Sequence, residues 1–221
     1  MDPARLIAAC ALLIAVLANP LASASQKEAP GGRVNLVTAT FDPVNMGRFT
    51  FRDDGGLAFE PNLRMATGFT LAYHREVVPK LIVGVSLGYL HTLVDYSSHP
   101  GTFDGDGFDD GVRGYADLLR PAIELGGLWS PSVESIDFGA GVRFGPAVVW
   151  FEDLRMVGFF GAVEASATFW FNGWLGLHVS IGLSVDSVWA TDASGWAASE
   201  IEGAAAYTVF LDVGLGLRAR F

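Results

Sequence analysis

The sequence predicts an all-β protein, a single closed antiparallel up-and-down transmembrane β-barrel of about eight strands. Three observations lead to this prediction. Side chains alternate with a period of two over long segments, which indicates β-strands. One face of these segments is large and apolar, whereas the other carries mostly Gly, Ala and Ser with a few charges. The composition, 51% hydrophobic and only 17% charged over 221 residues, is unusual for a water-soluble chain.

The segment 175–189 shows the alternation most clearly. Its odd positions are mostly large and apolar, as at Leu177 and Ile181, and its even positions are small or polar, as at Gly182 and Ser184. A strand surface that faces water normally carries Lys, Glu and Thr. We therefore predict that the bulky face contacts lipid and that the small face lines a narrow barrel. A soluble ligand-binding barrel with bulky residues inside is the alternative, but its glycine-rich outer face would be hard to solvate.

The N-terminus has the features of an export signal. Arg5 precedes an apolar run over 6–18, and the small residues 22–24 provide a cleavage site. We therefore predict that residues 1–24 are removed. A lipoprotein signal ending at Cys10 is the alternative, although few apolar residues precede that position. Cys10 is the only cysteine in the sequence, so the mature chain is expected to have no disulfide and no thiolate metal site.

The barrel domain is predicted to cover residues 25–221. Beyond the N-terminal region no stretch of about 18 uninterrupted apolar residues occurs, so strands rather than helices are expected to cross the membrane. The first strand alternates poorly, and Phe49–Arg52 are assigned either to an extra strand or to a loop. The predicted strands are 33–41, 64–75, 81–91, 117–129, 135–151, 156–171, 174–189 and 206–221.

The predicted connections alternate in length. With both termini in the periplasm, every long connection falls outside the cell, and this asymmetry is typical of outer-membrane barrels. For the short turn after Trp170, parity favours a three-residue loop that pairs Trp170 with Trp174 and places Gly173 in the left-handed conformation. The long connections are 42–63, 92–116 and 190–205, and the short ones are 76–80, 130–134, 152–155 and 172–173.

Aromatic residues on the face assigned to lipid form two groups. In the predicted topology they fall near the two rims of the barrel, as do the aromatic girdles of membrane barrels. The alternative is that aromatic residues simply favour strand ends. The external group is Tyr89, Trp150, Trp189 and Tyr207, and the periplasmic group is Tyr73, Trp129, Phe169 and Phe221.

The C-terminal segment 213–221 ends in Phe221 and has apolar residues at alternate positions before it. It looks like the signal read by the barrel-assembly machinery, except that small Ala219 stands where an aromatic residue is often found. The chain as a whole resembles the eight-stranded outer-membrane barrels of the OmpA, OmpX and OmpW type. The resemblance implies residence in the cell outer membrane, with the lipid bilayer, lipopolysaccharide and the barrel-assembly machinery as partners.

The predicted lumen is narrow, so inward charges are expected to pair with one another. Symmetric turns place Glu124 opposite Arg143 and Arg143 opposite Glu164, which makes a rung across three strands. We hypothesise that this rung plugs the barrel at mid-height and that breaking it opens ion leakage. The alternative is that the charges only satisfy one another. The predicted lumen network comprises Glu124, Arg143, Glu164, His178, Ser180, Asp186 and Asp212. Parity places further inward charges at Arg64, His74, Arg120, Asp137, Arg218 and Arg220.

A hydrolytic site is a further hypothesis for the lumen. The predicted register sets Ser180 opposite Glu164, and His178 lies two residues away on the same face. The pattern resembles the His-x-Ser motif of outer-membrane lipid A deacylases, which would make Ser180 the nucleophile. No Asn follows Ser180, and a filled lumen would hardly admit a lipid chain, so an ordinary polar interior is the preferred interpretation.

The external loops are acidic. Close carboxylates in the second long loop could bind Ca²⁺ or bridge to lipopolysaccharide through divalent ions, but the spacing does not match a helix-loop-helix calcium site, and a solvated acidic loop is the simpler interpretation. His91, Asp95 and His99 give no defined metal geometry. The carboxylates of the possible cation-binding loop are Asp104, Asp106, Asp109 and Asp110.

The sequence predicts a non-enzymatic integral outer-membrane barrel with a role in envelope integrity or surface interaction. The alternatives are a narrow channel for small solutes or apolar compounds, and a lipid A-modifying hydrolase. A lateral gap in the wall or unpaired charge in the lumen would favour the channel. We expect a monomer without cofactor or metal, and the formal charge of -10 argues against a nucleic-acid partner.

Overall fold

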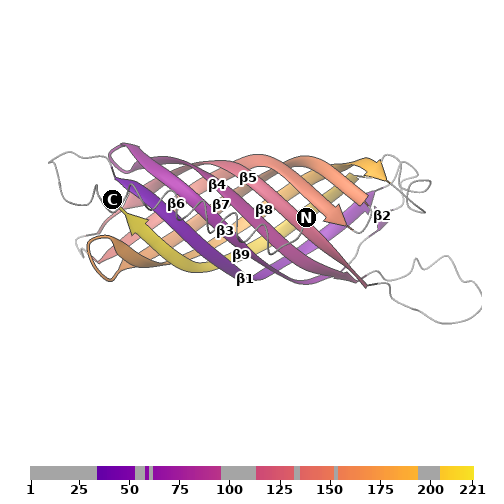
Figure 1. Cartoon of the computed structure of the whole chain (residues 1–221), viewed down its shortest axis with the longest axis horizontal. Coiled ribbons are helices and arrows are strands. Elements are labelled where there is room, and N and C mark those ends of the chain that lie inside the picture. Colours follow the sequence, from indigo (N-terminus) through magenta and orange to yellow (C-terminus); the bar gives the residue numbers. More distant parts are fainter. Residues whose placement is uncertain are drawn as a thin grey trace, which may run out of the picture.

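A computed structural model describes residues 34–52, 58–59, 62–95, 113–131, 135–151, 154–193 and 205–221. Nine antiparallel strands form one sheet that closes on itself (Figure 1). Eight of them are long, and the two-residue β2 pairs only with the far end of β1. The strands are β1 (Asn35–Arg52), β2 (Ala58–Phe59), β3 (Asn62–Val78), β4 (Leu81–Asp95), β5 (Arg113–Trp129), β6 (Ile136–Phe151), β7 (Leu154–Trp170), β8 (Leu175–Ala193) and β9 (Ala205–Arg220).

Closure comes from pairing of the first and last strands. β1 pairs with β9 from Leu36↔Arg220 to Arg52↔Ala205, and every other long strand pairs with its neighbour in the chain. A closed sheet leaves no unpaired edge, which a barrel in a bilayer requires. The predicted fold class, a closed antiparallel barrel of eight long strands, is confirmed. Among the described residues no helix is long and apolar enough to cross a membrane.

The first strand is longer than predicted. Phe49–Arg52 belong to β1, so most of the expected 42–63 connection is strand. β1 has a bulge, which lies between Asp42 and Asn45 against β3 and between Phe41 and Val44 against β9, and Pro43 lies within it. A bulge adds one residue to a strand and shifts its parity, which explains why the sequence alternates poorly there. β4 and β5 also extend past their predicted ends, to Asp95 and from Arg113.

The turn between β7 and β8 is wider than predicted. Trp170 pairs with Gly176 rather than with Trp174, and Gly173 does not adopt the left-handed conformation. The side chain of Asn172 organises the turn, since its Oδ1 accepts hydrogen bonds from the backbone nitrogens of residues 174 and 175 at 3.0 and 2.7 Å. The pairing of β7 with β8 is therefore shifted by two residues from the predicted register, and a shift of two leaves every side chain on its predicted face.

The two ends of the barrel are distinct. The end that carries Phe221 and the turns at 79–80 and 171–174 is called the inner rim below, and the opposite end the outer rim (Figure 1). The tight turn at the inner rim places Lys80 at φ 70°, after Pro79, with its backbone N–H bonded to Glu76. In the topology predicted from the sequence the inner rim faces the periplasm.

The large apolar side chains point outward, as predicted. Ile181 and Leu183 are 53% and 52% exposed, whereas their strand neighbours His178 and Asp186 are 1% and 0% exposed. The soluble-barrel alternative required the reverse and is wrong. A continuous apolar belt on a closed barrel is stable only against lipid hydrocarbon. The protein is therefore a barrel of the cell outer membrane.

The aromatic girdles follow the predicted arrangement. Trp150, Trp189 and Tyr207 are exposed near the outer rim, and Trp129 and Phe169 are exposed near the inner rim. Tyr73, Tyr89 and Phe221 are partly covered. Rings at these two levels match the polar-apolar boundaries of a bilayer.

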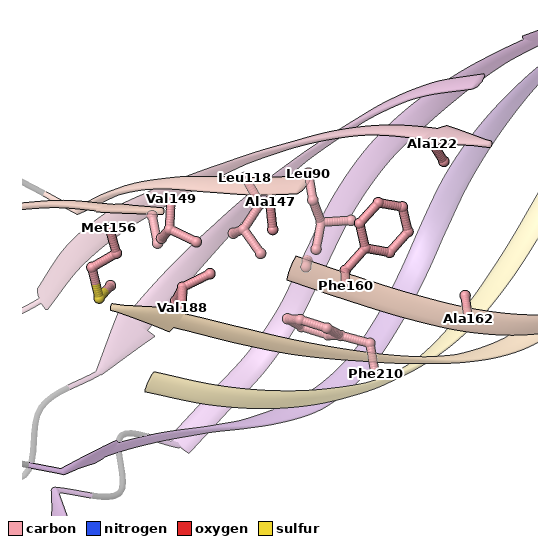
Figure 2. Packing of buried hydrophobic residues seen from close by; sticks show 12 residues of the cluster. Leu90, Leu118, Ala122, Ala147, Val149, Met156, Phe160, Ala162, Val188 and Phe210 are labelled. Atoms are coloured by element: carbon pink, nitrogen blue, oxygen red, sulfur yellow. The ribbon is translucent and has the colours of Figure 1, made fainter. Parts of the chain in front are cut away.

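The interior is layered, which differs from the uniformly small and polar lumen that the sequence suggests. The outer half is apolar and is filled by large inward side chains (Figure 2). A polar layer follows toward the inner rim, and a small apolar cluster of Leu36, Ile82 and Trp170 lies beyond it, with Val34 and Leu128 packed against it. The outer apolar cluster consists of Ala66, Leu90, Ala116, Leu118, Ala122, Ala147, Val149, Met156, Phe160, Ala162, Val188 and Phe210.

Candidate functional site

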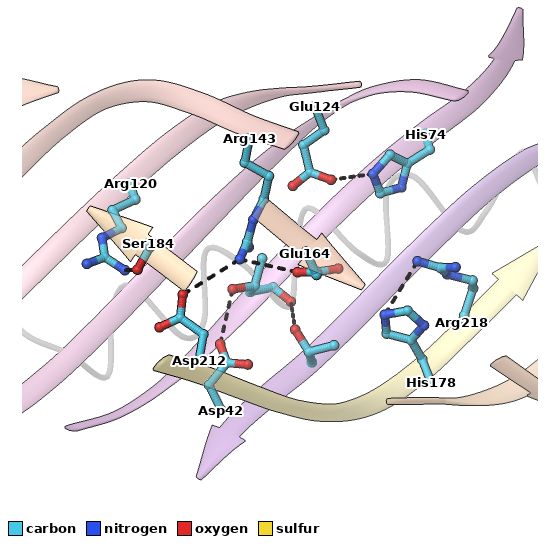
Figure 3. A network of polar contacts seen from close by, with 12 residues as sticks. Asp42, His74, Arg120, Glu124, Arg143, Glu164, His178, Ser184, Asp212 and Arg218 are labelled. Carbon is cyan, nitrogen blue, oxygen red and sulfur yellow. Dashed lines mark hydrogen bonds and ion pairs between the residues drawn. The ribbon is translucent and has the colours of Figure 1, made fainter. Parts of the chain in front are cut away.

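The predicted rung centred on Arg143 exists, with one error of register. Arg143 of β6 lies opposite Glu124 of β5, as predicted, but it lies opposite Ala162 of β7 rather than Glu164. The turn between β6 and β7 is centred one position earlier than expected, which displaces β7 by two residues. The long Arg143 side chain still reaches Glu164 diagonally, with Nη2 to Oε2 at 3.2 Å (Figure 3). We call this ionic layer the inner plug.

Two more titratable side chains, Asp212 and His74, join the inner plug. Asp212 of β9 lies 4.0 Å from the Arg143 guanidinium, as the predicted network required. His74 of β3 contacts Glu124 through its Nε2. The sequence analysis placed His74 inside the barrel but predicted no partner for it. Gly84 lies opposite His74, and a Cβ at Gly84 would come within 2.4 Å of the imidazole ring. Glycine at this position is therefore needed for His74 to lie flat against β4.

Asp42 is the residue of the inner plug that the sequence analysis missed. It accepts a hydrogen bond from Thr70 Oγ1 at 3.2 Å and lines a cavity together with Arg143 and Asp212. Asp42 comes at the start of the β1 bulge, so parity counted from the end of the predicted strand could not place its side chain. Pro43, next to it, was the sequence signal for the irregularity.

A second ionic pair closes the lumen nearer the outer rim. Arg120 donates two hydrogen bonds to Asp186, from Nε to Oδ1 at 2.9 Å and from Nη2 to Oδ2 at 2.5 Å. Thr208 donates a further bond to the same carboxylate. The guanidinium lies over the rings of Phe160 and Phe210, 5.7 and 5.0 Å from their centroids. We call this group the outer plug.

The carboxylate of the outer plug is buried and fully paired. Asp186 has no exposed surface, and both of its oxygens accept hydrogen bonds from buried donors. A planar bidentate pair between aromatic rings is the geometry in which an arginine is best held. Asp186 was predicted to face the lumen, and its side chain is buried inside the barrel. Its partner Arg120 was placed inside by parity, but its pairing with Asp186 was not predicted.

His178 and Ser180 both face the lumen but do not form a hydrolytic site. His178 contacts Thr168 Oγ1 through Nδ1 at 3.1 Å and Arg218 through Nε2 at 3.4 Å, so neither ring nitrogen engages Ser180. Ser180 lies opposite Ser166 rather than Glu164, because of the wider turn between β7 and β8. Arg218, in turn, donates to Thr38 Oγ1 at 2.8 Å. The predicted constellation of nucleophile, base and acid is therefore not assembled.

Two small cavities flank Arg143. One, of about 30 Å³, is bordered by Asp42, Arg120, Arg143 and Asp212, and the other, of about 40 Å³, lies on the side of His74. Each has room for a few water molecules. The buried atoms Nδ1 of His74, Nε of Arg143 and Oδ1 of Asp212 lack a hydrogen-bond partner among the described residues. Water in the cavities would satisfy them, so the inner plug is suited to hydration, whereas both carboxylate oxygens of the outer plug already accept hydrogen bonds from protein donors.

The barrel wall has an interruption between β5 and β6. Their ladder runs from Ala116↔Phe151 to Leu119↔Val148 and resumes at Ile123↔Phe144, and no pairing joins residues 120–122 to residues 145–147. The flanking register sets Pro121 opposite Pro146, and proline has no N–H to donate to a ladder. We call this stretch the seam.

The seam is closed by direct backbone contact. A Cβ at Gly145 would lie 2.0 Å from the carbonyl oxygen of Pro121, so only glycine allows the two strands to approach this closely. The side chains of Ala122 and Ala147 are buried on the lumen side of the seam, next to Arg120. Prolines in the middle of a paired strand are rare, and their presence in two predicted strands was a visible sequence signal that the sequence analysis did not use.

The predicted cation-binding loop lies outside the described residues, as do Asp104, Asp106, Asp109 and Asp110 themselves. Within the described part of the chain, no group of three or more His, Cys, Asp or Glu side chains could hold a metal ion. The predicted export signal also lies outside this part.

No family model matches the sequence, and neither does any curated protein. The structure is similar to that of the outer membrane protein OprG from Pseudomonas aeruginosa, with a TM-score of 0.55 and 12% identity over 85% of this chain and 95% of that chain. The outer membrane protein AlkL gives a TM-score of 0.49 with 14% identity over 88% and 93% of the two chains. The outer membrane protease OmpT from Escherichia coli gives 0.45 with 12% identity over 89% and 99%. At 12% identity the likeness to OprG shows the fold, an outer-membrane β-barrel, and does not extend to activity.

Proposed function

We propose that the protein is a non-enzymatic outer-membrane barrel with a sealed lumen, serving envelope integrity or surface interaction. The observation that carries the proposal is the outer plug, in which a buried Arg120–Asp186 pair is held between two phenylalanine rings. The inner plug lies below it, and the two cavities described beside Arg143 are water-sized. Such an interior supports a barrel that acts through its surfaces rather than by conducting ions.

Conductance across planar bilayers tests the sealed lumen. We expect the wild-type protein to be silent, and Arg143→Ala alone to remain silent because the outer plug still closes the lumen. A triple variant that combines Arg120→Ala and Asp186→Ala with Arg143→Ala removes both plugs and should conduct ions. Arg75→Ala, on the exposed outer surface near the inner rim, is the matched control. Steady conductance by the wild-type protein would overturn the proposal.

The seam favours a second candidate function, passage of small apolar molecules into the bilayer. The apolar outer half of the lumen ends at the outer plug, and the seam beside Arg120 is the stretch of the β5–β6 ladder that no hydrogen bond holds together. An apolar molecule that entered from the outer rim could not pass the buried charge pair of the outer plug. If β5 and β6 separated at the seam, the molecule could leave the lumen sideways into the lipid hydrocarbon.

The two prolines provide the test of this second function. The variant Pro121→Val with Pro146→Val supplies both missing N–H donors and should slow the entry of a small fluorescent hydrocarbon into liposomes that contain the barrel. Ile123→Val, outward-facing on the same strand just beyond the seam, is the control. Equal entry rates for the proline variant, the control and the wild type would contradict the proposal. Before the variants are compared, the wild-type protein must be shown to raise the rate of hydrocarbon entry above that of empty liposomes.

A further inference from the structure

Polar side chains form one row on the lipid-facing surface near the outer rim. His91 of β4 lies opposite Asp117 of β5, Asp117 lies opposite Trp150 of β6, and Trp150 lies opposite Arg155 of β7. All four residues share the outward parity of their strands. A charge on the lipid face of a barrel is destabilising at the bilayer midplane by about 2–4 kcal/mol and is tolerated near the interfaces. The row therefore marks the level of the lipid headgroups.

Asp117 organises one end of the row. Its Oδ1 accepts hydrogen bonds from the Tyr89 hydroxyl at 2.6 Å and from Nδ1 of His91 at 2.7 Å. The His91 ring also stacks on Tyr115, with centroids 5.1 Å apart and an interplanar angle of 14°. The His91 and Asp117 side chains are 44% and 40% exposed, so the cluster lies at the surface rather than beneath it. Because Nδ1 donates to Asp117, Nε2 on the opposite edge of the ring is a donor for an external ligand when the imidazole carries both protons.

Arg155 supplies the cation at the other end. Its residue is exposed, and it lies three strands from His91, a separation of roughly 14 Å at about 4.8 Å per strand. Between the two ends, Trp150 and Tyr115 present exposed aromatic rings. An arginine and a histidine donor separated by aromatic rings fit a ligand with an anionic group at each end and sugar rings between them.

We propose that this row binds the phosphorylated disaccharide headgroup of a lipopolysaccharide molecule in the outer leaflet. Arg155 receives one phosphate and His91 the other, while Tyr115 and Trp150 pack against the sugars. The acyl chains then run along the apolar belt toward the midplane. Asp117 is a positioning residue, because its carboxylate is occupied by Tyr89 and His91. The inference rests on the membrane location and the predicted orientation, and it is independent of what the lumen does.

Lipid retention by the purified, folded barrel tests the proposal. The detergent-solubilised protein is incubated with bisphosphorylated lipid A, washed and analysed by native mass spectrometry. We expect Arg155→Gln and His91→Gln each to lower the retained lipid A about tenfold, as loss of one charge-assisted contact to a phosphate predicts. Arg75→Gln, an exposed arginine of the same outer surface near the inner rim, is the matched control and should retain lipid A like the wild type. Heat-modifiable gel mobility verifies that each variant is folded.

The ligand chemistry is tested in a second arm. Lipid A from which both phosphates have been removed loses both contacts, so it should bind the wild type more weakly than bisphosphorylated lipid A binds the Arg155→Gln variant. Equal retention of the two lipids would overturn the proposal, and so would an equal loss in Arg75→Gln, which would indicate general attraction of anionic lipid. Unchanged binding by both row variants would also overturn it. None of these results bears on conductance or on hydrocarbon entry, so failure here is separable from failure of the proposed function.

Discussion

The outer and inner halves of the lumen are both closed by buried charged groups, but these groups are surrounded differently. Both contain buried arginine and carboxylate groups, but the outer plug is embedded in apolar and aromatic side chains, with every oxygen of Asp186 bonded. The inner plug surrounds Arg143 with several carboxylates, leaves three buried atoms without a partner among the described residues and borders two cavities. A barrel interior can therefore combine a fully paired closure with one that leaves room for water.

The largest expected effect is removal of the acid from the outer plug. Asp186→Ala leaves Arg120 charged, buried and unpaired, which should lower the free energy of unfolding by about 3–5 kcal/mol. Urea titration of the protein in lipid vesicles measures this change. As a control, the double variant Arg120→Met with Asp186→Leu fills the same space without charge and should be nearly as stable as the wild type. A small loss for the single variant would mean that water reaches the outer plug.

The corresponding change in the inner plug should matter less. Glu164→Ala removes one of several carboxylates near Arg143, and water from the adjoining cavity can replace it. We expect a loss of about 1–2 kcal/mol in the same titration, since the remaining acids still pair with the guanidinium. If Glu164→Ala destabilises the barrel as much as Asp186→Ala does, the inner plug is not hydrated and the contrast between the halves disappears.

The aromatic rings over Arg120 provide an intermediate test. Phe210→Leu keeps most of the buried volume but removes one face of the cation–π contact, and we expect a loss of about 1–2 kcal/mol. The same change at outward-facing Phe144, which contacts lipid, should have a smaller effect. Equal losses would show that packing volume, and not the ring over the guanidinium, stabilises the outer plug.

The smallest expected difference compares two neutral donors. Thr208 donates to Asp186 in the outer plug and Thr70 donates to Asp42 beside the inner cavity. Thr208→Val should destabilise by about 1–2 kcal/mol because no water can take its place, whereas Thr70→Val should change stability by less than about 0.5 kcal/mol. A larger loss for Thr70→Val than for Thr208→Val would mean that water replaces the lost donor at the outer plug and not beside the inner cavity.

The side-chain faces were predictable from the sequence, and the pairings were less so. Both register errors, at Arg143 and at Ser180, are shifts of two residues, and a strand moved by two keeps each side chain on its face. The shifts arise in turns, where the Asn172 side chain and the length of the link between β6 and β7 decide the register. Neither leaves a trace in the alternation of the strands.

The missed residues have two physical causes. Asp42 escaped because a bulge breaks parity where β1 was expected to end. The apolar outer half was missed because Phe160 and Phe210 lie on strands whose other inward positions are mostly small or polar, so the strand average hides them. Local exceptions of this kind depend on what lies across the lumen, which only the closed barrel brings together.

The position of the seam has a mechanical consequence. The chain closes where β1 meets β9 through a ladder that runs almost the full length of both strands, and the interrupted β5–β6 junction lies four strands away in either direction. The barrel thus consists of two halves of four long strands, joined by the continuous β1–β9 ladder on one side and by the seam on the opposite side. Any change in cross-section forced by bilayer thickness or lateral pressure is expected to start at the seam, while the β1–β9 ladder keeps the two halves in register.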